Sequence, residues 1–329
     1  MPSPEVVLDT VLDRSLIGGY TKLGYLARRR SWTGGRADPA PGSLAGRTAL
    51  VTGAGGGLGE ATARGLAELG ATVHLLVRSE EKGRAVRDRI LAAVPGATRE
   101  RLPVQVCDLG ELAKVREFAA RFTAQVGSLD VLVHNAGLVP PERTETSEGN
   151  EITLAVHVLG PLLLTRGLAD ALAKGAELSG TDSRVLFVSS GGMYAQPLVA
   201  DDLQFREGKY GGTAAYARTK RMQVVLTGIL AEELAPRGIT VHALHPGWAR
   251  TPGVTDVYPA FDKILGPLLR SPDQGADTAV WLAAAPSSEV GTGRFWHDRA
   301  PRPEHYLSRT QETPEQVERF RAEVDRLTA

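Results

Sequence analysis

A run of glycines between a strand-like segment and a helical pattern constrains this chain more than any other part of its sequence. Residues 48–51 lead directly into Thr52-Gly53-Ala54-Gly55-Gly56-Gly57-Leu58-Gly59, and helical spacing continues to residue 70. Glycines at a strand-to-helix turn let backbone amides approach a phosphate, and the helix dipole favours the negative charge. The pattern predicts a dinucleotide-binding turn, with a purely structural turn as the alternative. We expect its cofactor contacts at Gly53, Gly55, Gly56, Gly57, Leu58 and Gly59.

Short strand-like runs alternate with longer helical patterns along most of the chain. After the first, they lie at residues 72–77, 104–106, 131–134, 184–188 and 240–244. Strands alternating with helices are typical of a parallel sheet with both faces covered. We therefore expect an α/β fold. It would be a single Rossmann-type, doubly wound parallel sheet of about seven strands, with the glycine turn at its carboxyl edge.

The segments that flank this pattern suggest the domain boundaries. We expect an N-terminal helical extension at residues 1–32, a glycine- and proline-rich linker at 33–46, the sheet domain at 47–297 and a C-terminal extension at 298–329. In the last of these, Thr313 followed by Pro314 predicts the start of a helix that ends near Leu327.

The N-terminal segment has an amphipathic pattern. Apolar residues recur at helical spacing at Leu12, Leu16, Tyr20, Leu23 and Ala27, and three arginines follow at 28–30. Such a segment can lie on a membrane surface. The glycines at 18, 19 and 24 weaken an isolated helix, so docking onto the protein's own core is favoured over peripheral membrane contact.

Charge and composition narrow the partners. Lys plus Arg and Asp plus Glu both number 38, so no net charge attracts nucleic acid. Cys107 is the only cysteine, which excludes an intramolecular disulfide and a Cys-rich metal site. The N-terminus has no signal-peptide pattern, and no apolar run nears the roughly 20 residues that span a bilayer. We expect a cytoplasmic protein that binds neither metal nor nucleic acid, and a homo-oligomer is compatible with these features.

The residues that follow the second and third strand-like segments bear on the choice of cofactor. An acidic residue after the second segment would hold a ribose 2′-hydroxyl, whereas an arginine accommodates a 2′-phosphate. That segment leads into Arg78, so we expect NADP(H) to be preferred over NAD(H); a solvated surface charge is the alternative. Asp108 is placed to bond the adenine edge or to cap its loop, and Leu109 is a further candidate contact.

Tyr216 and Lys220 are the strongest candidates for acid–base chemistry. They lie four positions apart in a helical stretch and therefore share a face. A tyrosine of pKa near 10 is a poor acid–base group at neutral pH, but a neighbouring ammonium favours the phenolate and lowers that pKa. Ser190, after the segment 184–188, can donate a hydrogen bond to a carbonyl oxygen. These groups suffice for hydride transfer between a nicotinamide and a carbonyl or alcohol.

Five motifs follow one another along the chain. They are the glycine run, His134-Asn135-Ala136-Gly137, Val188-Ser189-Ser190, Tyr216-x-x-x-Lys220 and Pro246-Gly247. In this order, over residues 44–295, the chain resembles the short-chain dehydrogenase/reductase family. The resemblance implies Tyr216 as acid–base residue, Lys220 as its pKa modulator and ribose ligand, and Ser190, or else Ser189, as substrate orienter. It also implies cofactor contacts at Asn135, Ala136, Gly137, Tyr216, Lys220, Pro246, Gly247 and Thr251.

Two features depart from the common pattern of that family. His157 stands where its members usually carry an asparagine that supports a water linked to the lysine. A histidine there can relay protons as a catalytic group or simply pack. Ser190 and Tyr216 are 26 positions apart, roughly twice the usual spacing, and the extra residues 193–213 resemble the retinol-dehydrogenase-like branch. Residues 20–25, 245–254 and 274–278 resemble the member-twelve group of dehydrogenase/reductases.

The substrate side is marked only by apolar residues. They recur at Val257, Tyr258, Phe261, Ile264, Leu265 and Leu268. The resemblance implies a mobile substrate lid there, which favours a hydrophobic carbonyl or alcohol substrate, although core packing explains the spacing equally well. Trp248 and Met193 are candidate pocket walls. The alternative function, favoured only by His157, is an NADP-binding scaffold or redox sensor with little catalysis.

Overall fold

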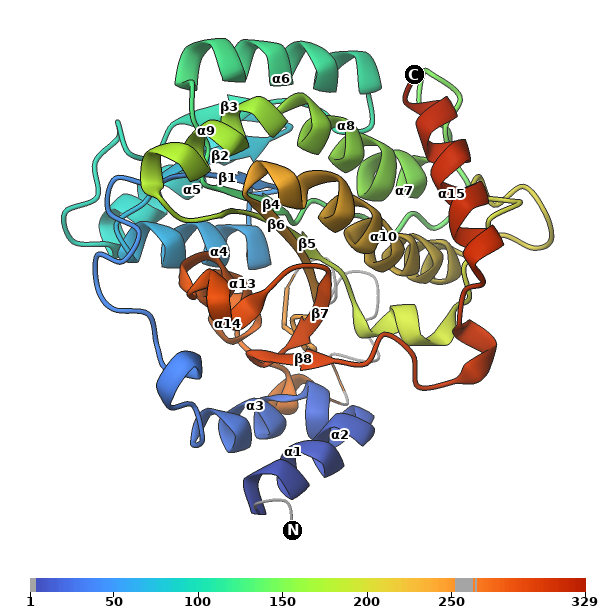
Figure 1. The fold of residues 1–329 in the computed structure, drawn as a ribbon, viewed down its shortest axis with the longest axis horizontal. Coiled ribbons are helices and arrows are strands. Elements are labelled where there is room, and N and C mark those ends of the chain that lie inside the picture. The colour runs from blue at the N-terminus through green and yellow to red at the C-terminus, as the bar shows by residue number, and fades with distance from the viewer. Residues whose placement is uncertain (1–3, 252–262, 264) are drawn as a thin grey trace.

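An eight-stranded sheet forms the centre of the molecule (Figure 1). The computed structural model describes residues 4–251, 263 and 265–329. The strand order is β3-β2-β1-β4-β5-β6-β7-β8, and all neighbours except β7 and β8 pair in parallel. The strands are β1 (Thr48–Thr52), β2 (Thr72–Val77), β3 (Val104–Val106), β4 (Val131–His134), β5 (Ser183–Val188), β6 (Ile239–Leu244), β7 (Arg294–His297) and β8 (Ala300–Arg302). The order reverses between β1 and β4 as in doubly wound folds, so the predicted α/β class is confirmed.

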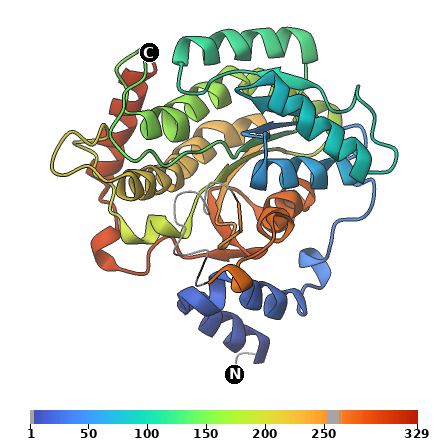
Figure 2. The same cartoon turned by 180° about the vertical axis from the view of Figure 1, so that it is seen from behind.

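Helices cover both faces of the sheet (Figures 1 and 2). One layer contains α4 (Gly57–Glu68), α5 (Glu80–Ala93), α13 (Pro272–Ala284) and α14 (Ser287–Val290). The other contains α6 (Leu112–Val126), α8 (Gly160–Gly167), α9 (Ala169–Ser179) and α10 (Gly212–Leu234). The central strands β5 and β6 are buried at every residue, which is why their apolar residues do not alternate with exposed polar ones.

The number of strands differs from the expected seven because β7 turns back into a short antiparallel strand. Asp298 and Arg299 form the two-residue connection, with φ of 52° and 56°. Positive φ at both central residues matches the twist of a tight hairpin. Pro301 lies in β8, where an edge position tolerates a residue without a backbone N–H. β8 therefore lies beyond residue 297, the expected end of the sheet domain.

Residues 4–32, here called the N-terminal cap, form three short helices at one end of the molecule (Figures 1 and 2). They are α1 (Pro4–Arg14), α2 (Leu16–Tyr20) and α3 (Lys22–Arg29). Arg28 is buried and bonds both Asp9 at 2.7 Å and Asp298 at 2.8 Å. Asp298 also pairs with the buried Arg270 at 2.6 Å. Buried ion pairs thus dock the cap onto the body of the protein.

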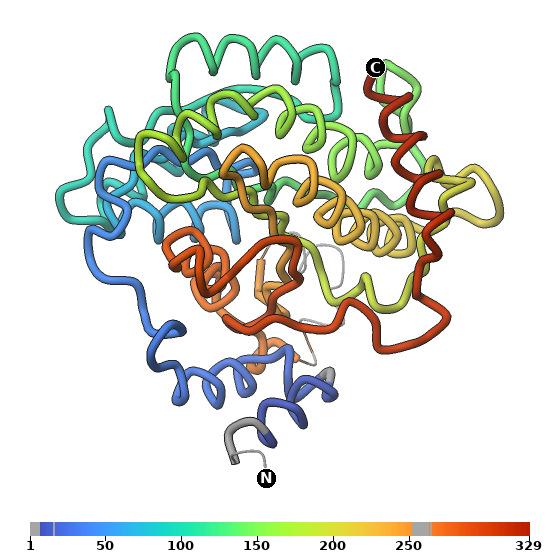
Figure 3. Tube along the Cα trace, viewed as in Figure 1, coloured from blue at the N-terminus to red at the C-terminus, as the bar shows by residue number. Residues whose placement is uncertain are grey.

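From the cap, the chain follows the outside of the molecule to β1 (Figure 3). At the other end of the chain, α15 (Pro314–Leu327) begins after Thr313, whose hydroxyl accepts a hydrogen bond from Gln316 N. Phe320 and Val324 of α15 are buried against the layer that contains α10.

Within the described part of the chain, none of the helices has by itself the length and apolar character needed to cross a bilayer. The bent pair Ile152–Gly167 and Ala169–Ser179 meets that criterion on length and composition alone.

Candidate active site

Gly53 and Gly59 are two positions of the turn between β1 and α4 at which a side chain would not fit. Gly53 has φ of +65°, and a Cβ atom there would lie 2.7 Å from the Cα of Ala136. A Cβ on Gly59 would lie 2.3 Å from the carbonyl oxygen of Gly53. The residue that caps α4 is Gly56, which has no side chain to bond the amides of the first turn. The turn therefore offers backbone N–H groups at the positive end of a helix, which suits a pyrophosphate.

Asn135 and Thr52 tie this turn to the end of β4. Thr52 Oγ1 accepts hydrogen bonds from the backbone N–H groups of Asn135 and Ala136, both at 3.0 Å. The Asn135 side chain donates to the carbonyl oxygens of Thr52 at 3.1 Å and Gly53 at 3.3 Å. Since β1 and β4 are neighbours where the strand order reverses, Asn135 fixes the turn at the place where such folds bind ligands.

The predicted cofactor residues after β2 and β3 occupy different environments. Arg78 is exposed directly after β2, and the glycine turn lies nearby, because a Cβ on Gly55 would be 3.7 Å from Val77. Asp108 Oδ1 accepts a hydrogen bond from Gly110 N at 2.9 Å, which is the loop cap considered above. The side chain of Leu109 is buried in the core beneath this loop.

Lys220 is fixed beside Tyr216 on α10. Its Nζ atom lies 5.3 Å from the centre of the Tyr216 ring and donates to the carbonyl oxygen of Val188, at the end of β5, at 2.8 Å. The side chain is buried, and burial lowers the pKa of Lys220 to about 7. Tyr216 itself is partly exposed. The helix thus holds a cation of unusually low pKa next to a phenol that solvent can reach.

The two candidate serines have different partners. The Ser189 hydroxyl is buried and donates to the carbonyl oxygen of Lys220 at 2.9 Å, so it joins β5 to α10. The Ser190 hydroxyl is partly exposed and accepts a hydrogen bond from Gly192 N at 3.1 Å. An accepting hydroxyl keeps its proton for another acceptor, which favours Ser190 as the residue that would orient a substrate.

His157 is packed rather than arranged as a relay. Its Nε2 accepts from Leu138 N at 3.0 Å, so the ring proton is on Nδ1, which bonds Thr219 Oγ1 at 2.8 Å. Burial, together with the nearby Lys220 charge, lowers the pKa of His157 well below its usual value. The neutral ring meets Tyr216 edge-on, with centroids 5.5 Å apart. Of the two interpretations from sequence, these contacts favour packing.

Gln223 is a buried neighbour of Lys220 that the sequence patterns did not indicate. Its Oε1 accepts a hydrogen bond from Lys220 Nζ at 3.1 Å, and its Nε2 donates to the carbonyl oxygen of His157 at 2.8 Å. The side-chain amide therefore bridges the lysine and the π-helical turn Ala155–Leu159, which follows α7 (Ile152–Leu154). The only signal in the sequence was its position three residues after Lys220, on the same helix face.

The loop after β6 contains the remaining predicted cofactor residues. Gly247 has φ of +75°, and a Cβ there would collide with the Arg270 guanidinium, 2.3 Å from Nε. Pro246 O accepts a long hydrogen bond, at 3.4 Å, from Arg270 Nη1. The cap braces the same loop, since Trp248 N donates to Tyr20 O at 2.7 Å. Thr251 is partly exposed at the end of this loop.

The candidate substrate residues are described only in part. Val257, Tyr258, Phe261 and Ile264 lie outside the described residues, while Leu265 and Leu268 are partly buried. Met193 is fully buried in the core next to α10, so it packs and does not form a pocket wall. Trp248 is partly exposed and contacts the Tyr20 ring, with centroids 5.8 Å apart.

Several of the predicted residues form one continuous group along the carboxyl edge of the sheet. Asn135 bonds the glycine turn, and Leu138, three residues later, bonds His157. His157 contacts Tyr216, which lies beside Lys220. The glycine turn and the Tyr216 helix are thus linked through the Asn135 and His157 side chains and the backbone N–H of Leu138, although Tyr216 follows Gly59 by 157 positions.

Comparisons with known proteins show what the chain is similar to. A family model described as short chain dehydrogenase matches residues 47–201. Dehydrogenase/reductase SDR family member 12 from Bos taurus is 37% identical over 303 residues, which cover 92% of this chain and 91% of that protein. Retinol dehydrogenase 13 from Mus musculus is 33% identical over 309 residues, covering 89% and 88% respectively. Among solved structures, the Pseudomonas aeruginosa RhlG/NADP active-site complex aligns with a TM-score of 0.63 at 25% identity, over 79% of this chain and 96% of that one.

Proposed function

The chain belongs to the short-chain dehydrogenase/reductase family, and on this premise we propose that it transfers hydride between NADP(H) and a hydrophobic carbonyl or alcohol substrate. Members of this family are oxidoreductases of alcohol and carbonyl groups. One observation carries the proposal for the reacting groups: Lys220 Nζ is buried 5.3 Å from the Tyr216 ring centre and held there by Val188 O. A lysine at the same helical spacing but on the surface would not be held at a fixed distance from the tyrosine ring.

The glycine turn fits the proposed cofactor. Gly53 and Gly59 leave room where a Cβ would collide with backbone atoms, and the first turn of α4 keeps its amides for a pyrophosphate. When bound, the nicotinamide supplies or accepts the hydride. Arg78 is exposed beside this turn and supports a preference for NADP(H), because a guanidinium matches a 2′-phosphate. The NADP complex of the Pseudomonas aeruginosa relative is consistent with that preference.

In the reductive direction, the Tyr216 phenol gives its proton to the substrate oxygen while the substrate carbon receives hydride. Ser190 holds that oxygen by donating a hydrogen bond. The Lys220 ammonium stabilises the phenolate that remains on Tyr216, since an opposite charge nearby favours the ionised form. In the oxidative direction the same proton returns from the alcohol to the phenolate.

Gln223 positions Lys220 in this proposal. Burial disfavours the ammonium form, whereas the Gln223 and Val188 oxygens, 3.1 Å and 2.8 Å from Nζ, favour it by accepting hydrogen bonds. The bond from Gln223 to the His157 carbonyl at 2.8 Å fixes the amide orientation. Gln223 thus joins the lysine to the residue at which the family pattern has an asparagine.

A screen of carbonyl compounds tests the proposed reaction. NADPH consumption is followed with aliphatic, aromatic, steroid and retinoid carbonyls, and each reaction is repeated with NADH. We expect turnover with at least one hydrophobic class and faster turnover with NADPH. Binding of NADPH without turnover of any class would instead support the scaffold alternative.

A further inference from the structure

Exposed apolar side chains gather on the N-terminal cap. Among the residues whose side chains the structure describes, nine large hydrophobic ones are exposed, and six of these lie between residues 7 and 26. The six are Val7, Leu8, Val11, Ile17, Leu23 and Leu26. Scattered single residues of this kind are ordinary on a protein surface, whereas a concentration on one element marks an interaction surface.

Spacing places five of these six residues on outward faces of two helices. Val7, Leu8 and Val11 share one face of α1, and Leu23 and Leu26 share one face of α3. Val11 is 61% exposed and Leu23 58% exposed. On the inward side, Tyr20 of α2 and Tyr25 of α3 are buried. Asp9 of α1 pairs with Arg302 of β8. The cap is therefore attached to the body on one side and apolar on the other.

The cap and the linker together carry more basic than acidic side chains. Residues 1–46 contain six arginines or lysines and four acidic residues, in a chain without net charge. Two of the acids face the body: Asp9 pairs with Arg302 at 2.8 Å, and Asp13 accepts from the Tyr306 hydroxyl at 2.5 Å. The basic side chains of Lys22, Arg29 and Arg30 are exposed. The outward surface is consequently both apolar and cationic.

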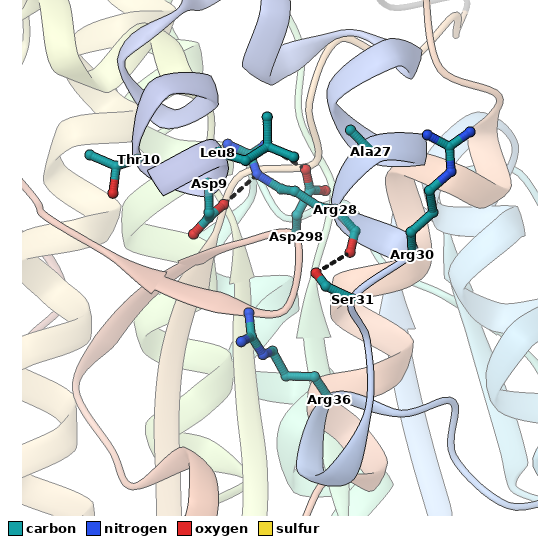
Figure 4. Close-up of a pocket in the computed structure, with 9 residues that line it drawn as sticks. All are labelled: Leu8, Asp9, Thr10, Ala27, Arg28, Arg30, Ser31, Arg36 and Asp298. Carbon is teal, nitrogen blue, oxygen red and sulfur yellow. Dashed lines mark hydrogen bonds and ion pairs between the residues drawn. The ribbon is translucent and has the colours of Figure 1, made fainter. Parts of the chain in front are cut away.

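A cavity of about 280 Å³ within the cap and linker adds to this basic surface (Figure 4). Its lining includes Arg28, Arg30 and Arg36, together with Ser31. The two carboxylates that also line it, Asp9 and Asp298, pair with Arg28, so Arg30 and Arg36 supply the basic character of the lining. The cavity therefore favours an anionic group such as the phosphate of a lipid headgroup.

We infer that the outward face of the N-terminal cap docks onto a bilayer that contains anionic phospholipids. The apolar side chains enter the interfacial region, and the basic residues around them meet the lipid phosphates. A second copy of the chain fits this face poorly, because a two-fold contact would place identical cationic surfaces against each other. The combination of apolar and cationic groups is what an anionic lipid surface complements.

The position of the cap also indicates where the substrate comes from, an inference that rests on the proposed function. The cap bonds the loop after β6, where Trp248 N donates to Tyr20 O at 2.7 Å and Arg270 Nε donates to Tyr20 O at 3.1 Å. Docking of the cap would bring this loop, with its predicted cofactor residues Pro246 and Gly247, close to the bilayer. A hydrophobic carbonyl or alcohol dissolved in the membrane is the substrate class that this arrangement favours.

Vesicle co-sedimentation of the full chain tests the docking surface without requiring turnover. We expect the chain to sediment with phosphatidylcholine vesicles that contain about 30% phosphatidylserine, and binding to fall several-fold when salt is raised to about 0.3 M. Pure phosphatidylcholine vesicles should bind it much more weakly. The double variant Val11→Ser/Leu23→Ser should lower partitioning by about tenfold or more.

Leu178→Ser is the matched control, because Leu178 is 67% exposed on α9, outside the cap. It should bind vesicles as the unaltered chain does, and all variants should keep the same unfolding midpoint and NADPH affinity. The inference is overturned if vesicles that contain phosphatidylserine do not bind the chain, or if Leu178→Ser loses as much binding as the double variant. A stable dimer that the double variant converts to monomers, without vesicle binding, would assign the face to a second copy instead.

Discussion

Lys220 Nζ donates a hydrogen bond to Gln223 Oε1 at 3.1 Å, so a neutral side chain holds the buried cation of the candidate active site. Gln223 is itself held by the carbonyl oxygen of His157. A substitution of Gln223 should therefore change the pKa of Lys220. In the contacts described above, Gln223 touches neither Tyr216 nor the glycine turn.

Substitutions of Gln223 should shift the pH dependence of cofactor affinity in opposite directions. Lys220 must be protonated to donate to the cofactor ribose, so the NADPH affinity should fall as pH rises through the lysine pKa. Gln223→Glu adds an opposite charge and should move this fall to higher pH by about 1 unit or more. Gln223→Leu removes an acceptor and should move it to lower pH. Fluorescence titrations of NADPH between about pH 6.5 and 9.5 measure both, and a shift in the same direction for both variants would rule out this role.

The stability of the cofactor-free protein should rise with pH because of Lys220. Burial lowers the folded-state pKa to about 7, whereas the unfolded value is about 10.4. Between these values the unfolded chain binds more protons, so the free energy of unfolding increases with pH. Relative to Lys220→Met, which lacks the titrating group, the wild-type melting temperature should gain several degrees between about pH 6.5 and 9.5. Parallel melting temperatures for the two proteins would contradict the buried, perturbed lysine.

Arg78→Ala should weaken NADPH binding by about tenfold or more, because a charge-assisted hydrogen bond to the 2′-phosphate is lost. NADH affinity should not change. Arg84→Ala serves as the control, since Arg84 is an exposed arginine of α5 that pairs with Glu80. Titrations of both cofactors against the three proteins make the comparison. Equal affinities of the wild type for NADPH and NADH would show that Arg78 is a solvated surface charge.

Two glycines of the cofactor turn should respond differently to alanine. In Gly59→Ala the new Cβ would lie 2.3 Å from the Gly53 carbonyl oxygen, so the backbone must move. We expect a loss of about 1–3 kcal/mol in the free energy of unfolding and loss of NADPH binding. In Gly55→Ala the nearest atom is 3.7 Å away, and the unfolding midpoint should stay unchanged. Urea unfolding of the two variants measures the difference. If both alanine substitutions left the unfolding midpoint unchanged, the turn would be flexible and not close-packed.

Much of the fold could be predicted from the sequence because strand and helix periodicity is strong where both faces of the sheet are buried. β8 could not, since it has three residues and includes Pro301. Its hairpin also lacks the usual Asn-Gly or Asp-Gly signal, using Asp298 and Arg299 instead. The ion pairs of Asp298 with Arg28 and Arg270, partners far away in the sequence, supply support that no local pattern contains.

The site was predictable only where a motif fixes the backbone. The glycine turn, Asn135, and the pairing of Tyr216 with Lys220 are consequences of strand ends and helix spacing. The bridge through Gln223 and the packing of His157 depend on side-chain orientations across two helices, which the sequence does not specify. Met193 illustrates the same limit, because an apolar residue after a strand suits a pocket wall and a core position equally well.

The most direct measurement of the central claim is single-turnover reduction by Tyr216→Phe, with a substrate found in the carbonyl screen. Removing the phenol proton while keeping the ring should slow hydride transfer by about 10²–10⁴-fold, and NADPH affinity should remain near the wild-type value. Lys220→Ala should reduce both turnover and affinity, which separates the two roles. If Tyr216→Phe transferred hydride at nearly the wild-type rate, Tyr216 would not be the acid–base residue, and the account of this site would be wrong.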